Sequence, residues 1–267
     1  MNLTERYREL GPRRFARWVL LKRIGKPIVR SVDRFMVRQS LVGDPPIYDK
    51  ALFPWIPALE ASAPAIRAEL DRLLEQRDRL PTFTDIQPDQ GKINPDARWK
   101  TFFFCGLGVR SDHNRALCPE TARVLDRIPG LELAFFSILA PGLHIPEHAG
   151  VTKGLIRCHL ALKVPREADK VRMRVGDRSF HWEAGKAVVF DDTYRHEVWN
   201  DTDEERAVLL FDTVRPMRWP GRAAFALTRA LLRFSPFIRD SKRNQKRWEE
   251  RDGAAFERPP AAAEALL

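Results

Sequence analysis

The chain has 267 residues, enough for one large domain or two small ones, and its 44% hydrophobic content is ordinary for a globular protein with a real core. Its three cysteines, Cys105, Cys118 and Cys158, are an odd number without regular spacing. They exclude a disulfide-stapled secreted scaffold and predict free thiols in a reducing compartment. No signal-peptide cleavage pattern and no apolar stretch of about 18 residues is found, so we expect neither a signal peptide nor a membrane-spanning helix.

The net charge of +10 belongs to the two ends of the chain. Residues 1–43 and 214–251 each carry +8, whereas residues 44–213 carry −4. Ends of this kind bind nucleic acid or anionic lipid. Together with the Pro/Ala-rich composition of the last residues, the charge predicts four segments: a basic amphipathic N-terminal segment (1–43), a central body (44–214), a basic amphipathic helical segment (215–251) and a disordered tail (252–267).

The first part of the chain alternates between helical and irregular patterns. Within the basic N-terminal segment, Phe15, Trp18 and Val19 lie at helical spacing among several arginines and lysines. Residues 44–60 are rich in proline, and we expect a docking linker there. Residues 61–80 carry apolar side chains three or four positions apart, which predicts a helix.

Strand-like patterns dominate the middle of the chain. Residues 99–107 predict a buried strand, and residues 117–128 predict a short helix that ends at a Pro-Gly pair. Many short strands separated by turn signals are typical of a sandwich or a barrel. The remaining strand-like runs are residues 133–139, 155–164, 171–175, 179–182, 187–190, 197–199 and 207–214.

The segment 222–234 predicts a basic helix that also carries large apolar residues. Arg222, Arg229 and Arg233 fall on one helical face, and phenylalanine and leucine occupy much of the rest. Such a helix suits a membrane interface, where arginines meet phosphates and the apolar face reaches the acyl boundary. The alternative is a helix packed on the body with a solvated arginine stripe. Nucleic acid is disfavoured, because aliphatic residues outnumber the stacking aromatics and polar side chains that bases require.

Side chains that could bind an acid gather on two of the expected strands. Side chains alternate across a strand, so Arg157 and His159 share one face with the small Ala161, which leaves room for a carboxylate. Arg206, on the last strand, could clamp a second carboxylate. Alone, either arginine is more often a surface residue, but the pair on flanking strands favours a diacid.

Two histidines, His148 and His196, flank this strand-rich region. Neutral imidazole is the commonest metal ligand, and two histidines with open positions suit non-haem Fe(II). The carboxylate that usually follows the first histidine by two residues is missing, because that position is Gly150. Asp192 could replace it, either directly or through a water. Surface or core roles are assigned to His113, His144 and His181.

From Phe136 to Asp212 the chain resembles the aspartyl/asparaginyl β-hydroxylase family of Fe(II)- and 2-oxoglutarate-dependent dioxygenases. The resemblance covers under a third of the chain, and its motifs are specific and ordered. It implies a double-stranded β-helix (jelly-roll) core, so we expect an α+β chain with this core between helical, basic flanks. The matching pieces are FSILAPGLHIPEHAG (136–150), LIRCHLAL (155–162), WEAGKAVVFDDTYRHEVWN (182–200) and the Arg206 strand.

The resemblance also implies roles for individual residues. His148 and His196 are expected to bind iron, and Asp192 is expected to act beside the metal. The family itself has a glycine at the position of Gly150, where water is expected to complete the metal site. The residues that match the family's 2-oxoglutarate contacts are Ser137, Arg157, His159 and Arg206.

The family includes peptidyl Asp/Asn hydroxylases and bacterial enzymes that hydroxylate acyl chains of lipid A and of ornithine lipids. The barrel motifs do not choose between them, but the basic, apolar ends favour a lipid. We therefore expect a dioxygenase that uses Fe(II), 2-oxoglutarate and O2 on a lipid acyl chain, as a peripheral protein at the anionic cytoplasmic face of the inner membrane. The alternatives are a peptidyl hydroxylase with a protein substrate and a non-catalytic membrane- or ligand-binding jelly roll.

Overall fold

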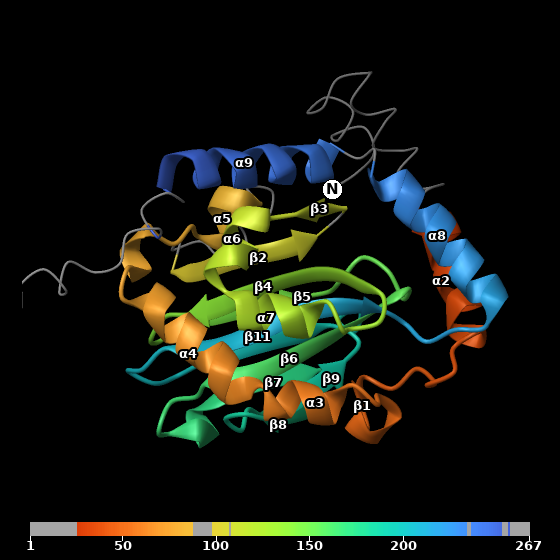
Figure 1. Cartoon of the computed structure of the whole chain (residues 1–267). Helices are drawn as coiled ribbons and strands as arrows, with labels where there is room; N and C mark the ends of the chain where they lie inside the picture. The colour runs from red at the N-terminus through yellow and green to blue at the C-terminus, as the bar shows by residue number, and fades with distance from the viewer. Residues whose placement is uncertain (1–25, 88–97, 107, 234–235, 253–255, 257–267) are drawn as a thin grey trace, which may run out of the picture.

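A computed structural model describes residues 26–87, 98–106, 108–233, 236–252 and 256 of the chain (Figure 1). The expected N-terminal helical pattern around Phe15 and Trp18 lies outside these residues. So does the expected tail, apart from Asp252 and Phe256. The division into four segments stays a prediction.

Eleven strands of the described residues form two antiparallel sheets. Apart from the β2–β3 and β7–β8 pairs, neighbouring strands are not consecutive in sequence, as in a jelly roll, and this confirms the expected α+β jelly-roll class. The larger sheet contains, in spatial order, β1 (Ile47–Tyr48), β9 (Ala187–Phe190), β6 (Leu155–Lys163), β11 (Arg206–Val214), β4 (Leu131–Leu139), β2 (Trp99–Gly106) and β3 (Val109–Arg110). The smaller sheet contains β5 (His144–His148), β10 (His196–Asn200), β7 (Val171–Val175) and β8 (Arg178–His181).

Helices cover one face and one edge of the larger sheet (Figure 1). The 61–80 prediction corresponds to α4, and the 117–128 prediction corresponds to α7. The helices are α2 (Lys26–Arg38), α3 (Ile56–Ala61), α4 (Ala63–Leu74), α5 (Phe83–Ile86), α6 (Asp112–Leu117), α7 (Pro119–Leu125), α8 (Trp219–Arg233) and α9 (Pro236–Asp252).

The larger sheet is buried on both faces, so its strands are nearly continuous apolar runs. On β6, Cys158 and Leu160 join the core beneath the helices, whereas Ala161 joins the core between the two sheets. This alternation confirms the face assignment that placed Arg157 and His159 with Ala161. The inner face therefore mixes apolar residues with two cationic or polar side chains.

The proline-rich stretch 44–60 is not a linker, contrary to expectation. It forms β1 and α3, and its apolar side chains Tyr48, Phe53 and Ile56 are buried in the core beneath the helices. The prediction was wrong because the prolines begin and separate short elements and do not keep the chain extended. One of them lies in the first turn of α3.

Strand β5 was not expected from the sequence, because HIPEH carries a proline and charged residues. It lies at the edge of the smaller sheet, where a missing backbone N–H costs nothing. This strand matters for function because His148 is its last residue.

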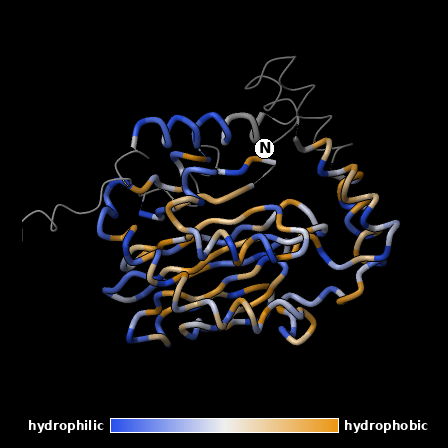
Figure 2. Tube along the Cα trace, in the orientation of Figure 1, coloured by the Kyte–Doolittle hydropathy of each residue, from blue (hydrophilic) through white to orange (hydrophobic). Residues whose placement is uncertain are grey.

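The predicted basic helix at 222–234 is α8, and it packs against α2 from the other end of the described chain. Met36, Met217 and Phe225 form a small buried cluster between the two helices. Figure 2 shows α9 as mostly hydrophilic, whereas hydrophobic stretches recur along α2 and α8. Within the described ranges, no helix combines the length and apolar character needed to cross a membrane.

Candidate active site

The two histidines lie side by side at one end of the smaller sheet. His148 ends β5 and His196 begins β10, and the two residues are direct partners in the antiparallel pairing. Their ring centroids are 4.1 Å apart and the rings are tilted by 58°. Residues 48 positions apart in sequence therefore present two imidazoles to one point, as the sequence predicted for a metal site.

Both imidazoles are fixed in the same tautomer. The Nδ1 of His148 contacts the carbonyl oxygen of Pro146 at 2.9 Å, and the Nδ1 of His196 contacts that of Tyr194 at 2.9 Å. A carbonyl oxygen can only accept, so each Nδ1 carries the proton and each Nε2 keeps a free lone pair. Burial lowers the pKa of His148, and burial followed by the neighbouring His148 lowers the pKa of His196 to about 3. Both rings are thus neutral at physiological pH, and each can offer its Nε2 lone pair to a metal.

Gly150 lies against the carboxylate of Asp192. A Cβ added at Gly150 would stand 2.3 Å from Oδ1 of Asp192, and the Gly150 N–H donates to the Asp192 carbonyl oxygen at 2.7 Å. The aspartate therefore fills the space that a carboxylate side chain at position 150 would need. Burial raises the pKa of Asp192 to about 6, although the Arg157 cation opposes that shift.

Arg157 has protein carboxylates on two sides. Its Nε and Nη2 donate to the two oxygens of Asp212 at 2.7 and 2.8 Å, and Nη2 lies 3.1 Å from Oδ2 of Asp192. Burial alone would lower the pKa of Arg157, but Asp192 and Asp212 raise it. The sequence predicted that Arg157 binds the carboxylate of a ligand, whereas the carboxylates beside it in the structure belong to the chain itself. A cosubstrate contact for Arg157 stays a prediction.

Arg206 has the opposite environment. Its side chain is 1% exposed, and its guanidinium lies 4.5 Å from the ring centroid of Trp182. Its Nε and Nη1 have no hydrogen-bond partner among the residues that the structure describes. Burial lowers the pKa of Arg206 to about 9. A buried cation without a carboxylate is costly unless an anion joins it.

His159 lies beside Arg206 on the neighbouring strand. Both of its ring nitrogens are buried without a partner, and its ring is stacked near Trp182 with centroids 5.9 Å apart. Burial, with help from Arg206 and Arg157, lowers the pKa of His159 well below its ordinary value. A neutral imidazole can donate to an anion next to Arg206 without adding a second charge.

Ser137 lies on β4, on the same inner face of the larger sheet as Arg206. Its Oγ accepts a hydrogen bond from Nε1 of Trp99 at 2.9 Å, which leaves the hydroxyl proton free to be donated. Phe83 stacks on Trp99 with ring centroids 4.0 Å apart and so fixes the indole. Ser137 is the β4 partner of Val208, two positions along β11 from Arg206.

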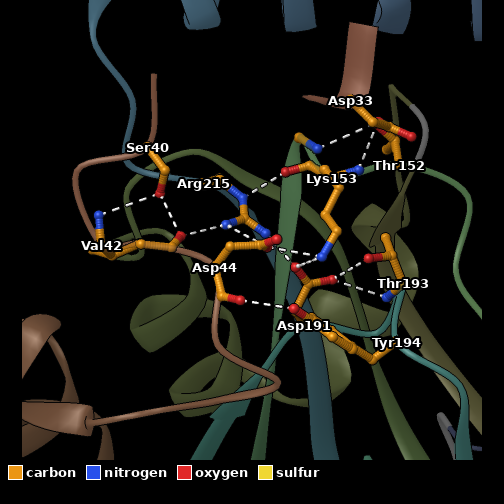
Figure 3. Close-up of polar contacts among 12 residues, drawn as sticks. Asp33, Ser40, Val42, Asp44, Thr152, Lys153, Asp191, Thr193, Tyr194 and Arg215 are labelled. Carbon is orange, nitrogen blue, oxygen red and sulfur yellow. Dashed lines mark hydrogen bonds and ion pairs between the residues drawn. The ribbon is translucent and has the colours of Figure 1, made fainter. Parts of the chain in front are cut away.

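A buried ion-pair network holds the loops around the site (Figure 3). Asp191, next to Asp192, accepts hydrogen bonds from Arg215, from Nζ of Lys153 at 3.0 Å and from the backbone N–H of Thr193 at 2.9 Å. Neither Asp191 nor Arg215 is exposed. Removing one member of such a pair costs about 3–5 kcal/mol, so the network fixes the loop that carries Asp192.

Several residues of the site were not expected from the sequence. The alternation of side chains along β11 shows which face Asp212 occupies, but it does not show that Asp212 binds Arg157. The aromatic walls and the Asp191 partners come from segments far apart in the chain, and no local spacing relates them. They are Trp99, Trp182, Phe190, Lys153 and Arg215.

The site can offer a metal two nitrogen ligands. Among the described residues, no group of three or more His, Cys, Asp or Glu side chains could hold a metal ion. Asp192 is engaged by Arg157, and position 150 carries no side chain. The two-histidine metal site stays a prediction. The remaining positions around a metal would be open to water and to an anion near Arg206.

The comparison with protein families gives one match that covers more than half of the chain. The model described as aspartyl/asparaginyl beta-hydroxylase matches residues 60–216, from α3 to the end of the larger sheet. All the residues of the site lie within this range.

Comparison with individual proteins extends the similarity into the flanks. An ornithine lipid ester-linked acyl 2-hydroxylase from Rhizobium tropici is 44% identical over 87% of this chain and 84% of its own length. Aspartate beta-hydroxylase domain-containing protein 2 from Rattus norvegicus is 31% identical over 74% of this chain and 62% of its own length. The human aspartyl/asparaginyl beta-hydroxylase is 30% identical over 50% of this chain and 18% of its own length.

The contact between Gly150 and Asp192 makes a prediction about metal binding. In Gly150→Ala the new methyl group must displace the Asp192 carboxylate, which lies 2.3 Å from its position. We expect the affinity for a divalent metal, measured by titration calorimetry, to fall by about 10–100-fold, as when groups that support metal ligands are lost. The matched control is Val151→Ala, which changes an exposed neighbour in the same loop. Equal affinities in the two variants would contradict the role given to this contact.

Proposed function

The chain belongs to the aspartyl/asparaginyl β-hydroxylase family, and from that premise we propose that it is a dioxygenase that hydroxylates an acyl chain of a membrane lipid. The hydroxylase class follows from the family. The use of Fe(II), 2-oxoglutarate and O2, the lipid substrate and the membrane location are proposed for this chain.

The observation that carries the cosubstrate proposal is the unpaired, fully buried guanidinium of Arg206. Charge balance calls for an anion there, and the hydroxyl of Ser137 and the neutral His159 face the same space. A dicarboxylate such as 2-oxoglutarate would pair one carboxylate with Arg206 and direct its keto-acid end towards His148 and His196. Trp182 would cover that carboxylate and exclude water, which strengthens the pairing.

His148 and His196 are the residues that would hold Fe(II), because their Nε2 lone pairs are free and both rings are neutral. Bound iron would supply the redox chemistry by which O2 and 2-oxoglutarate oxidise a C–H bond. The chain's own residues would orient the reactants. Arg157 holds the Asp192 carboxylate beside the histidines, and the Pro146 and Tyr194 carbonyls fix the two ring orientations.

A lipid is favoured over a protein substrate by the surface next to the site. Three large apolar side chains of α8 are strongly exposed: Trp219 at 73%, Leu227 at 64% and Leu231 at 67%. Exposed Ile28, Val29 and Phe35 of α2 add to them, and arginines of both helices are interspersed. This α2–α8 surface suits an anionic bilayer at the cytoplasmic face. The similarity to a lipid acyl hydroxylase over most of the chain supports the same choice.

The loop that follows His148 contacts α8 of the α2–α8 surface. The Cβ that Gly154 lacks would stand 2.1 Å from the ring of Phe225 of α8, so the loop after His148 packs tightly on that helix. Val151 in the same loop is 73% exposed and continues the apolar surface. A bilayer bound to α2 and α8 would thus lie next to the loop that follows His148.

Turnover on lipid vesicles tests the proposed function. With Fe(II), 2-oxoglutarate and O2, the protein should add one oxygen atom to an acyl chain of an ester-containing aminolipid, detected by mass spectrometry, and release succinate in equal amount. His196→Ala should abolish both products because one of two protein ligands is lost. Succinate release that depends on a peptide, without lipid oxidation, would replace the lipid by a peptidyl substrate.

The unpaired arginine makes a separate prediction. In Arg206→Met the apolar volume is kept but the charge partner of the distal carboxylate is lost, and such a loss costs about 3–5 kcal/mol. We expect the 2-oxoglutarate concentration for half-maximal decarboxylation to rise by about two orders of magnitude or more. Arg172→Met is the control, since Arg172 is an exposed arginine of the smaller sheet paired with Asp201. An unchanged requirement in Arg206→Met would remove this arginine from the cosubstrate site.

Docking on the membrane makes a prediction with two distinguishable parts. Leu227→Ser/Leu231→Ser should weaken sedimentation with anionic vesicles by about tenfold or more at any salt concentration, because apolar insertion is lost. Arg222→Ser should weaken it by about fivefold at low salt only, since each charge contributes about 1 kcal/mol and is screened. The control is Leu52→Ser, an exposed apolar residue away from the two helices. Wild-type binding by the double variant would contradict docking through α8.

A further inference from the structure

A cavity lies on the inner face of the larger sheet, away from the histidines. About 530 Å³ of empty space, which includes its opening to solvent, lies between α5, α9 and the strands β2, β3 and β4. Figure 1 shows α9 running along this edge of the sheet, above β3 and α5. The apolar side chains that line it are Phe83, Ile86, Phe103, Val109, Leu133 and Phe135.

The cavity and the Arg157–Asp212 pair lie at the same height along the strands of the larger sheet. Asp212, which holds Arg157, pairs with Leu133 on the next strand, and Leu133 pairs with Gly106 on the strand after that. Gly106 in turn pairs with Val109. Strands lie about 4.8 Å apart, so the first cavity residue is about 10 Å from Arg157 across two strands. One continuous inner face therefore links the two places.

The two walls of the cavity differ in polarity. The sheet and α5 supply the apolar wall, whereas α9 supplies Ser241, Lys242 and Gln245. The Oε1 of Gln245 is buried without a hydrogen-bond partner, although its Nε2 donates to Glu249 at 3.0 Å. An apolar ligand would lie against the sheet wall, and the α9 wall would meet solvent or a polar end.

We propose that this cavity receives the tail of the acyl chain that is hydroxylated, and this inference rests on the proposed lipid hydroxylase function. When a carbon close to the ester is at the metal site, the rest of the chain needs an apolar surface on which to lie. The inner face beyond Asp212 is the described surface that begins at the site and becomes apolar at Leu133.

Closing the cavity tests the inference by a binding measurement. The probe is cis-parinaric acid, a fluorescent fatty acid, titrated into the metal-free protein. The series Val109→Leu, Val109→Phe and Val109→Trp places growing side chains in the cavity from the short edge strand β3, where Val109 is half-buried. Each methylene kept out of the cavity should cost about fourfold in affinity, so the series should lose affinity stepwise, by about 15-fold or more for tryptophan.

The control is Leu52→Trp, which adds the same indole at an exposed position outside the cavity. It should bind the probe as the wild type does. Wild-type affinity throughout the Val109 series, in variants whose thermal denaturation is unchanged, would overturn the inference. The graded series keeps the test decisive, because the leucine and phenylalanine variants make small changes that an edge strand tolerates.

Turnover separates failure of the inference from failure of the proposed function. On aminolipids with the same head group, wild type should prefer a hexadecanoyl ester to a butanoyl ester, and Val109→Trp should lower kcat/KM for the long chain by about 15-fold while changing the short chain little. An unchanged long-chain preference in Val109→Trp would overturn the cavity assignment and leave the lipid hydroxylase intact. Absence of turnover on every acyl ester by the wild type would overturn the proposed function itself.

Discussion

The buried carboxylate of Asp191 is the interaction on which the architecture around the site depends. It joins three segments that are remote in sequence: the loop after His148 through Lys153, the connection from β11 to α8 through Arg215, and its own loop beside Asp192. Arg215 also donates to the carbonyl oxygens of Gly43 and Lys153, so the segment after α2 is tied to the same centre. Each charge is paired, and burial makes the pairing hard to break. Helices α2 and α8 are thereby fixed to the loops around the two histidines.

The two buried arginines on the inner face of the larger sheet differ in their partners, and this difference indicates where an anion would bind. Arg157 is neutralised by Asp192 and Asp212, so it serves to orient a carboxylate beside the histidines. Arg206, equally buried, has an aromatic ring beside it and no carboxylate. A fold that depended only on its own contacts would not keep such a group in its core. The site therefore calls for an anion, and a jelly roll supplies the dry, rigid walls that make that anion bind in one orientation.

Under the proposed function, access of the lipid and accommodation of its acyl tail would involve different parts of the molecule. The exposed apolar residues of α2 and α8 lie beside the loop after His148, and the tight contact between Gly154 and Phe225 makes that loop part of the same surface. The apolar cavity under α9 lies on the other side of the Arg157–Asp212 pair, along the sheet. A lipid that enters from a bilayer would pass the proposed metal site with its ester and extend its tail towards α9. This arrangement relates the basic, apolar ends of the chain to the reaction rather than to attachment alone.

The sequence by itself determined the elements whose signals are local. Period-two alternation placed Arg157 and His159 on one face of β6, helical spacing of arginines and apolar residues located most of α8, and the motifs around His148 and His196 identified the family and the jelly roll. It missed β5 and took residues 44–60 for a linker, because proline breaks strand patterns and yet is tolerated at edges and helix starts. Only the tertiary structure decided which arginine is paired, why Gly150 has no side chain, and where Asp191 finds its partners. Those facts depend on contacts between residues from distant segments, and no spacing along the chain encodes the short distances at which charges and atoms interact.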